Sequence, residues 1–330
     1  MPDLNTPEIK FALQAVRQAA QLIREVQAEL VSAAMTKDDR SPVTVADYAS
    51  QALVARLLSQ AFPDDPLVGE EDAAGLRLPE ARPTLEQVTR FVGHAIPAAS
   101  AASVCDWIDR GGAEPARRFW TLDPIDGTKG FLRSDQYAVA LALVIDGQVQ
   151  VGVLGCPNLS GAHRPDMGGE GSLVVAARGQ GAWTTSLASP ARLTRLQVST
   201  RADPAQARLL RSFESGHTNV SQIDEFAQAL AVQAEPVRMD SQAKYALLAS
   251  GQGDLLLRLL SPAKPDYREK IWDQAAGSLV VEEAGGRISD LHGKALDFSA
   301  GRTLKYNRGV LASNGRLHEP ALQTLQAIRA

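Results

Sequence analysis

The chain has few of the residues that build soft-metal sites and disulfide frameworks. Its 330 residues include five His and two Cys. Zinc in proteins is held mainly by His and Cys, so a zinc centre is disfavoured. Two cysteines, Cys105 and Cys156, are also too few for the disulfide framework of a small secreted protein. Any metal site in this chain would therefore depend on oxygen ligands.

The sequence also lacks a surplus of positive charge and a long apolar segment. A net charge of −4 argues against broad binding to nucleic acid or to an anionic membrane. No apolar run approaches the roughly 20 residues of a membrane span, and the N-terminus lacks the pattern of a secretory signal. With so few cysteines and no signal pattern, we expect a cytoplasmic protein, with an organellar location left open. The expected partner is a small molecule, and the expected state is a monomer or homodimer.

What the chain does contain is typical of a globular protein. The hydrophobic fraction is 45% and the charged fraction is 22%. The length suits one large domain or two closely packed ones. We predict an N-terminal α+β subdomain over residues 1–190 and a C-terminal α/β subdomain over residues 191–330.

In the first half, the periodicity predicts two helices and a largely antiparallel sheet. One amphipathic helix starts at Pro7, and a second helix should have Asp47 in its first turn. A strand from Leu67 ends in the acids Glu70 to Asp72. An apolar run over residues 137–145 and an alternating run over residues 148–155, joined by Asp146-Gly147, predict a hairpin with a two-residue turn.

In the second half, strands and helices alternate, which predicts a second α/β layer. We expect strands at residues 196–199, 236–239 and 255–260, and helices at residues 204–211, 222–231 and 243–250. A further helix should open at Asp273, with closing strands at residues 287–289 and 310–313.

The most informative stretch is Leu122-Asp123-Pro124-Ile125-Asp126-Gly127-Thr128. It places two carboxylates three residues apart and then exposes backbone amides. Carboxylate oxygens favour a hard cation, Mg²⁺ first, and the Ile125 carbonyl can add another oxygen. The alternative is an ordinary Asp-Pro and Asp-Gly surface turn.

Three further acids have contexts that would suit the same site. Asp47 and Asp273 stand at expected helix starts, and Glu70 stands at a strand end. Each also has a simpler explanation, as a helix cap or as a solvated strand end. If they converge with Asp123 and Asp126, divalent ions would have to compensate the repulsion between the charges. Their spacing in the sequence does not show that they converge.

Two motifs together supply a resemblance. Residues 122–128 and Ile271-Trp272-Asp273-Gln274-Ala275-Ala276-Gly277 resemble the paired signature of the inositol monophosphatase superfamily of lithium-sensitive Mg²⁺ phosphatases. Lys129-Gly130-Phe131 and residues 41–47, 68–72 and 155–159 resemble its 3'(2'),5'-bisphosphate nucleotidase branch. The resemblance implies a layered sandwich of alternating α-β-α-β-α layers.

The resemblance also implies roles for individual residues. Two or three Mg²⁺ ions are expected. Glu70, Asp123 and the Ile125 carbonyl would hold the first ion, Asp123, Asp126 and Asp273 the second, and Asp47 and Glu70 a third. Thr128, with Glu70 and Asp47, would orient and help to deprotonate the attacking water. The amides of Gly127 and Thr128 would bind the phosphate.

Selectivity for a nucleotide would reside in the second half. In this branch the positions that resemble His217, Ser241, Lys244 and Arg268 approach the adenosine and its 5'-phosphate. A structural histidine and solvated surface cations are the alternative interpretations of His217, Lys244 and Arg268.

The expected function is Mg²⁺-dependent hydrolysis of the 3'-phosphate of 3'-phosphoadenosine 5'-phosphate, and also of its sulfated relative. One alternative is an inositol (poly)phosphate phosphatase of the same fold. Another is a non-catalytic protein that senses the nucleotide or Mg²⁺.

Overall fold

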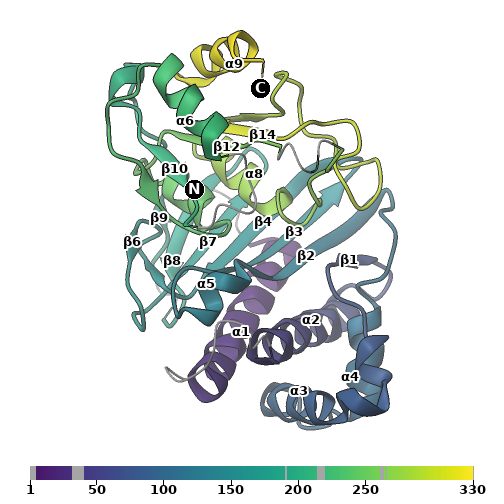
Figure 1. The fold of residues 1–330 in the computed structure, drawn as a ribbon. Coiled ribbons are helices and arrows are strands. Elements are labelled where there is room, and N and C mark those ends of the chain that lie inside the picture. Colours follow the sequence, from purple (N-terminus) through teal and green to yellow (C-terminus); the bar gives the residue numbers. More distant parts are fainter. Residues whose placement is uncertain are drawn as a thin grey trace.

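The computed structural model describes residues 5–31, 41–189, 192–213, 220–260, 264 and 266–329. Within these residues, two β-sheets alternate with three layers of helices (Figure 1). The first sheet has the strand order β1-β2-β3-β4-β7-β8-β9, and the second has the order β11-β10-β12-β14-β13. The predicted α-β-α-β-α sandwich is confirmed.

The first sheet is antiparallel except at one edge. Its β1 pairs in parallel with β2, and each later neighbour is antiparallel. The predicted hairpin is confirmed, and both residues of its turn have positive φ, 51° for Asp146 and 74° for Gly147. The strands are β1 (Leu67–Gly69), β2 (Arg118–Asp126), β3 (Ala138–Ile145), β4 (Gln148–Cys156), β7 (Ser172–Ala177), β8 (Gly181–Ser186) and β9 (Thr194–Arg195), and a small separate hairpin comprises β5 (Leu159–Ser160) and β6 (Arg164–Pro165).

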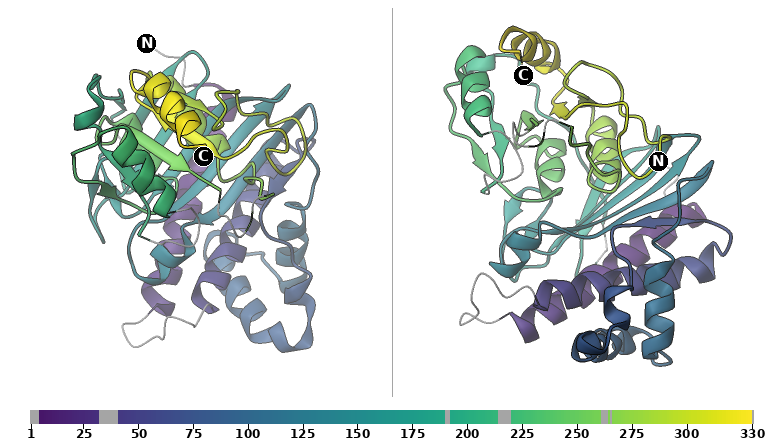
Figure 2. Two further views of the ribbon diagram at one scale, coloured as in Figure 1. Left: turned by 45° about the horizontal axis from the view of Figure 1, so that its top comes forward. Right: turned by 45° about the vertical axis from the view of Figure 1, so that its right-hand side comes forward.

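Helices α1 (Pro7–Leu30) and α2 (Ser41–Ala61) cover one face of this sheet (Figure 2). Beside them pack α3 (Arg82–Ala95) and α4 (Ala101–Asp109). Ser100 and Ser103 form a capping box at the start of α4. Such a box fixes a helix start even in an Ala- and Ser-rich stretch.

The prediction that Asp47 lies in the first turn of its helix was wrong. Helix α2 already begins at Ser41, so Asp47 falls in the second turn. Proline is tolerated in the first turn, so Pro42 does not delay the start. Burial of Val43 and Val45 in the core outweighs the extended preference of these β-branched residues.

Two helices fill the space between the sheets. Helix α8 (Ala275–Glu283) packs on β3, β4, β7 and β8 of the first sheet and on β13 and β14 of the second. Its neighbour is α7 (Ala243–Ala249), and Asp273 lies just before α8. Residues from both predicted subdomains pack into one core here. The subdomain boundary near residue 190 stays a prediction. The second sheet contains β10 (Leu209–Arg211), β11 (Val237–Arg238), β12 (Leu255–Arg258), β13 (Arg287–Ser289) and β14 (Val310–Ser313).

The outer layer consists of α6 (Val220–Ala229) and α9 (His318–Ala327), whose apolar residues share a core with the second sheet. A short 3₁₀ turn, η3 (Pro204–Gln206), precedes β10. Two more 3₁₀ turns, η1 (Gly75–Arg77) and η2 (Pro79–Ala81), precede α3. None of the helices in the described ranges combines the length and the apolar character that crossing a bilayer requires.

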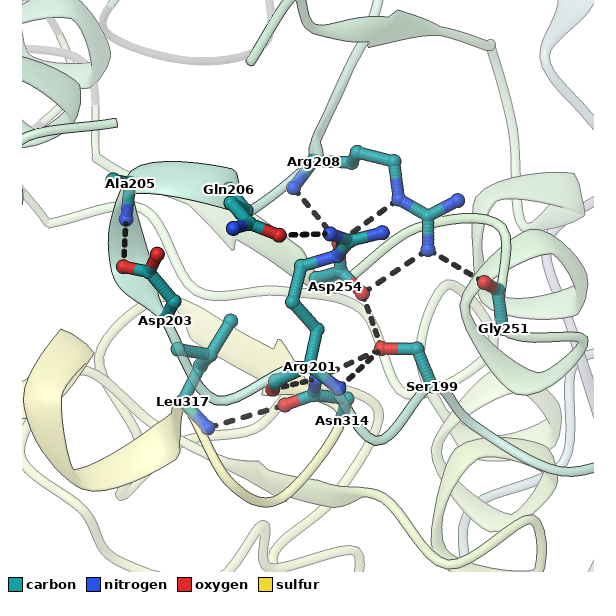
Figure 3. Close-up of polar contacts among 10 residues, drawn as sticks. All are labelled: Ser199, Arg201, Asp203, Ala205, Gln206, Arg208, Gly251, Asp254, Asn314 and Leu317. Atoms are coloured by element: carbon teal, nitrogen blue, oxygen red, sulfur yellow. Dashed lines mark hydrogen bonds and ion pairs between the residues drawn. The ribbon is translucent and has the colours of Figure 1, made fainter. Parts of the chain in front are cut away.

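The segment from 196 to 211 differs from the prediction of a strand followed by a helix. Residues 196–199 are not a strand, and the only helical piece is η3, whose start is capped by the Asp203 side chain. Figure 3 shows the reason: Asp254 accepts hydrogen bonds from the backbone and the side chain of Arg208 and from Ser199. These long-range bonds draw the chain onto the second sheet as β10.

Asp254 should therefore be a large contributor to stability. It is fully buried and forms ion pairs with Arg201 and Arg208. Burial alone would raise the pKa of Asp254, but hydrogen bonds from Arg208 and Ser199 outweigh it, so the pKa lies below its ordinary value. We expect Asp254→Asn to lower the free energy of unfolding by about 3 kcal/mol, because it leaves arginine charge uncompensated.

Urea denaturation measures this effect, and Asp203→Asn is the matched control. Asn caps a helix about as well as Asp, so the control should be nearly neutral. A loss for Asp254→Asn no larger than that of the control would contradict the role given to Asp254.

Candidate active site

A cavity of about 300 Å³ lies where β2 ends, next to the end of β1 and the turns that precede α7 and α8. Its lining contains acids and bases together. The acids are Glu70, Asp123, Asp126, Asp240 and Asp273. The bases are Lys129, Lys244, Arg258 and Lys270.

The end of β2 supplies the centre of the cavity. Asp123 and Asp126 both lie in β2, but the register with β3 shifts between them. A bulge of this kind re-aims side chains. Gly127 follows with φ 92° and caps the short helix α5 (Thr128–Leu132). A Cβ atom on Gly127 would lie 2.8 Å from Cβ of Ser241, so this position requires glycine.

Gln242 links the end of β2 to the other half of the chain. Its backbone N–H donates to Oδ2 of Asp126 at 2.6 Å. Its side chain donates to the carbonyl of Trp272 at 3.0 Å and accepts from the N–H of Gly277 at 3.1 Å. Asp126 is therefore fixed relative to the segment that carries Asp273.

Asp273 lies in a network of charged groups. Nη2 of Arg258 is 3.8 Å from Oδ2 of Asp273 and donates at 2.7 Å to Oε2 of Glu269. Gln274 also donates to Glu269, and its own amide oxygen accepts from Tyr245. The charge of Arg258 is thus shared between a buried glutamate and an acid of the cavity.

The acids lie close enough to raise one another's pKa values. Burial, and then the charges of Glu70, Asp126, Asp273 and Asp47, hold the pKa of Asp123 well above its ordinary value. Burial raises the pKa of Asp126 and Asp273 too, although Lys244 and Arg258 oppose the rise at Asp126 and Arg258 opposes it at Asp273. Several carboxylates would thus ionise together only with compensating positive charge.

Glu70 is exposed, whereas Asp126 and Asp273 are half-buried and Asp123 is buried. Desolvation, followed by the charges of Glu71 and Asp126, raises the pKa of Glu70 to about 7. A hydrogen bond with Asp123 and the charge of Lys270 act in the opposite direction. Water screens part of this shift, since the side chain is exposed.

The donor set fits a hard divalent cation. Among the described residues, Oδ1 of Asp123 is buried with no hydrogen-bond partner, and a buried carboxylate oxygen without a donor calls for a cation. The candidate ligands are all oxygens, which Mg²⁺ prefers. In the described part of the chain, no three His, Cys, Asp or Glu side chains form a ready-made coordination group. Bringing these oxygens onto an ion would therefore require side-chain adjustment.

The raised pKa of Glu70 predicts how stability depends on pH without divalent cations. An acid with a raised pKa in the folded state binds more protons folded than unfolded. Its stabilising contribution is fully present below about pH 4.5 and is lost as the pH rises to about 7. We expect the free energy of unfolding in EDTA to fall across this range, and less steeply in Glu70→Gln.

Saturating Mg²⁺ should remove the fall, because cations bind the ionised carboxylates. Urea titrations at a series of pH values, with EDTA or Mg²⁺, measure both effects. A fall in EDTA that Glu70→Gln leaves unchanged would contradict the assignment to Glu70.

The structure brings most of the candidate site residues to this one cavity. Of the candidates that the structure describes, two are not among its lining residues. Asp47 is buried. Burial, and then the charges of Glu71 and Glu70, raise its pKa, so Asp47 lies near these two glutamates. Arg268 donates to the carbonyls of Tyr267 and Lys305. Those in the lining are Glu70, Asp123, Ile125, Asp126, Gly127, Thr128, Ser241, Lys244 and Asp273.

His217 lies outside the described residues. The roles of Asp47, Arg268 and His217 stay predictions, as do the ligand and substrate roles of the residues inside the cavity. Sequence reasoning did not select Arg258, Lys270, Asp240 or Ser212, which also line the cavity. The signal for Arg258 was available, because a charged residue closes an otherwise apolar strand.

The fold is a five-layered α/β sandwich. Its cavity holds a group of acids next to the backbone turn at Gly127. The model of the inositol monophosphatase family matches residues 4–330. The chain therefore belongs to the inositol monophosphatase family.

Curated relatives match over nearly the whole chain. The chain is 42% identical to the 3'(2'),5'-bisphosphate nucleotidase of Schizosaccharomyces pombe, covering 97% of this chain and 95% of the relative. It is 44% identical to a protein of the same name from Oryza sativa, covering 97% and 93%. The similarity to these two relatives therefore covers nearly the whole chain and is not confined to the two motifs.

Solved structures agree on the fold. The IMPase of Thermotoga maritima superposes with a TM-score of 0.64 at 19% identity, covering 98% of each chain. CysQ of Bacteroides thetaiotaomicron superposes with a TM-score of 0.61 at 17% identity, covering 93% of this chain and 96% of that one.

Proposed function

We propose that this protein is a Mg²⁺-dependent phosphomonoesterase that hydrolyses the 3'-phosphate of 3'-phosphoadenosine 5'-phosphate to give AMP and phosphate. The observation that carries the proposal is the mixed lining of one cavity, in which a group of acids and the backbone turn at Gly127 and Thr128 adjoin a group of basic side chains. A substrate with two phosphates needs a cation site for the phosphate that is cleaved and basic side chains for the phosphate that is kept. The 3'(2'),5'-bisphosphate nucleotidases at 42% and 44% identity support the same substrate.

The acids would hold the cations, with two or three Mg²⁺ ions expected. Glu70, Asp123, Asp126, Asp273 and the Ile125 carbonyl are the proposed ligands, with Asp47 as a further ligand beside Glu70. Bound Mg²⁺ would neutralise charge on the phosphate and lower the pKa of the attacking water. The amides of Gly127 and Thr128 would bind the phosphate oxygens, which the open backbone of Gly127 permits.

Thr128 and Glu70 are the proposed residues for moving the proton of the water. Both line the cavity, so each would lie within reach of a water bound there. Asp47, beside Glu70, would help to orient them. No covalent intermediate on the protein is needed.

The second phosphate would lie near Lys244. Its Nζ donates to Oγ of Ser212 at 2.8 Å, and both residues line the cavity with Ser241. Burial, and then the charge of Arg258, lower the pKa of Lys244 to about 8, so the amine is mostly charged at neutral pH. A phosphate placed there would gain charge-assisted hydrogen bonds.

The test is phosphate release from 3'-phosphoadenosine 5'-phosphate in the presence of Mg²⁺, with identification of the nucleotide product. AMP as the product supports the proposal. Preference for an inositol phosphate, or nucleotide binding without turnover, would replace it with one of the two alternative functions. The sulfated relative of the nucleotide is the proposed second substrate.

A further inference from the structure

Arg302, in the segment between β13 and β14, reaches backbone that is far away in the sequence. Its Nη1 donates to the carbonyls of Gly111 and Ala113 at 3.1 and 3.0 Å, and its Nη2 donates to the carbonyl of Gly69 at 2.5 Å. Its Cζ lies 5.0 Å from the ring centroid of Trp272, within the range of a cation–π contact. One side chain thus touches both the residue before Glu70 and the residue before Asp273.

The Glu70 end of the cavity needs this support. Strand β1 has three residues and lies at the edge of the first sheet. The N–H of Gly69 bonds to the carbonyl of Gly111 at 2.8 Å, and Arg302 occupies the carbonyl of Gly69. After Glu70, buried Gln51 bonds both the N–H and the carbonyl of Glu71, at 3.1 and 2.6 Å. The backbone of Glu70 is therefore held on both sides by side chains.

The Asp273 end is held by the same segment. Lys270 forms an isolated β-bridge with Thr303, and the N–H of Ile271 donates to the carbonyl of Arg302 at 3.2 Å. The ring of Trp272, which is 5% exposed, lies under the guanidinium. The backbone of Arg302 therefore holds Ile271, and its side chain holds Trp272, the two residues that precede Asp273.

Only an arginine can make this set of contacts. The guanidinium is planar, presents five N–H donors in a fixed fork and stacks on aromatic rings. Lysine offers three donors at a single point and cannot span three carbonyls while covering an indole. The contacts are also backbone carbonyls, so they fix the course of the chain rather than one side-chain rotamer.

We propose that Arg302 is a positioning residue that sets the spacing between Glu70 and Asp273 and thereby the affinity of the site for a hard divalent cation. This inference deepens the proposed function and rests on its cation site. Partners that orient metal ligands from outside typically change metal affinity by about 10- to 100-fold when they are mutated.

Calorimetric titration of the full chain with Mg²⁺, without nucleotide, tests the proposal. The variants are Arg302→Met and Arg302→Lys. The matched control is Arg117→Met, because the Arg117 side chain is 84% exposed and pairs with Asp146 in the turn between β3 and β4. We expect Arg302→Met to weaken Mg²⁺ binding by about 10- to 100-fold, Arg302→Lys to lie between it and the wild type, and Arg117→Met to bind as the wild type does.

Circular dichroism at the titration temperature shows which variants are folded. A folded Arg302→Met that binds Mg²⁺ with wild-type affinity would overturn the proposal. If Arg302→Met does not fold, Arg302→Lys decides by the same criterion. Failure of the proposed function is a separate result: wild type that binds Mg²⁺ but does not hydrolyse the nucleotide overturns the substrate assignment and leaves the Arg302 comparison intact.

Discussion

Asp126→Asn and Asp273→Asn are each expected to abolish turnover of 3'-phosphoadenosine 5'-phosphate at any nucleotide concentration. Each substitution removes one anionic oxygen from the proposed cation site. A loss of about 4 kcal/mol of transition-state stabilisation corresponds to about a thousandfold in kcat. The fold should survive at Asp126, because the amide oxygen of Asn can still accept the hydrogen bond from the N–H of Gln242.

Asp146→Asn is the matched control for these variants. It makes the same chemical change at the exposed hairpin turn, where φ is 51° and Asn is well tolerated. Steady-state phosphate release over a range of Mg²⁺ concentrations measures the effect. Near wild-type kcat in folded Asp126→Asn and Asp273→Asn would remove both residues from the site.

Lys244→Met should separate the two proposed phosphate sites. Methionine nearly matches the volume of this buried side chain but removes its charge and its donors. We expect KM for the bisphosphate nucleotide to rise by about 10- to 100-fold, because a hydrogen bond to a charged group contributes about 1.5–3 kcal/mol. Activity on a simple monophosphate ester should change little. Lys10→Met, at an exposed position of α1, is the control.

The depressed pKa of Lys244 adds a pH signature. The amine is charged below about pH 8 and neutral above it. The wild-type KM for the nucleotide should therefore rise above about pH 8, while the KM of Lys244→Met should not follow this rise. A parallel rise in both proteins would show that a different group titrates.

Local chemistry made part of this fold predictable. The hairpin turn at Asp146-Gly147 follows from two residues that tolerate positive φ. The acids of β2 and the glycine after them could likewise be identified from one short stretch. These features depend on residues that are neighbours in the sequence, so their physics is visible there.

Long-range contacts limited the rest. Asp254 holds Arg208 just before strand β10, in a segment where local preference indicated a helix. Core packing of Val43 and Val45 begins α2 before Asp47. Arg302 contacts Gly69, 233 residues away, and no periodicity or motif marks such a contact. The acids of the site were identifiable, whereas the residues that hold them in place were not.

The cavity is proposed to hydrolyse a nucleotide bisphosphate at its 3'-phosphate. Phosphate release from 3'-phosphoadenosine 5'-phosphate and from inositol 1-phosphate, measured side by side with Mg²⁺ and with chromatography of the nucleotide product, tests it most directly. We predict a higher kcat/KM for the nucleotide, with AMP as its product. A higher kcat/KM for inositol 1-phosphate, or adenosine 3'-phosphate as the product, would contradict it.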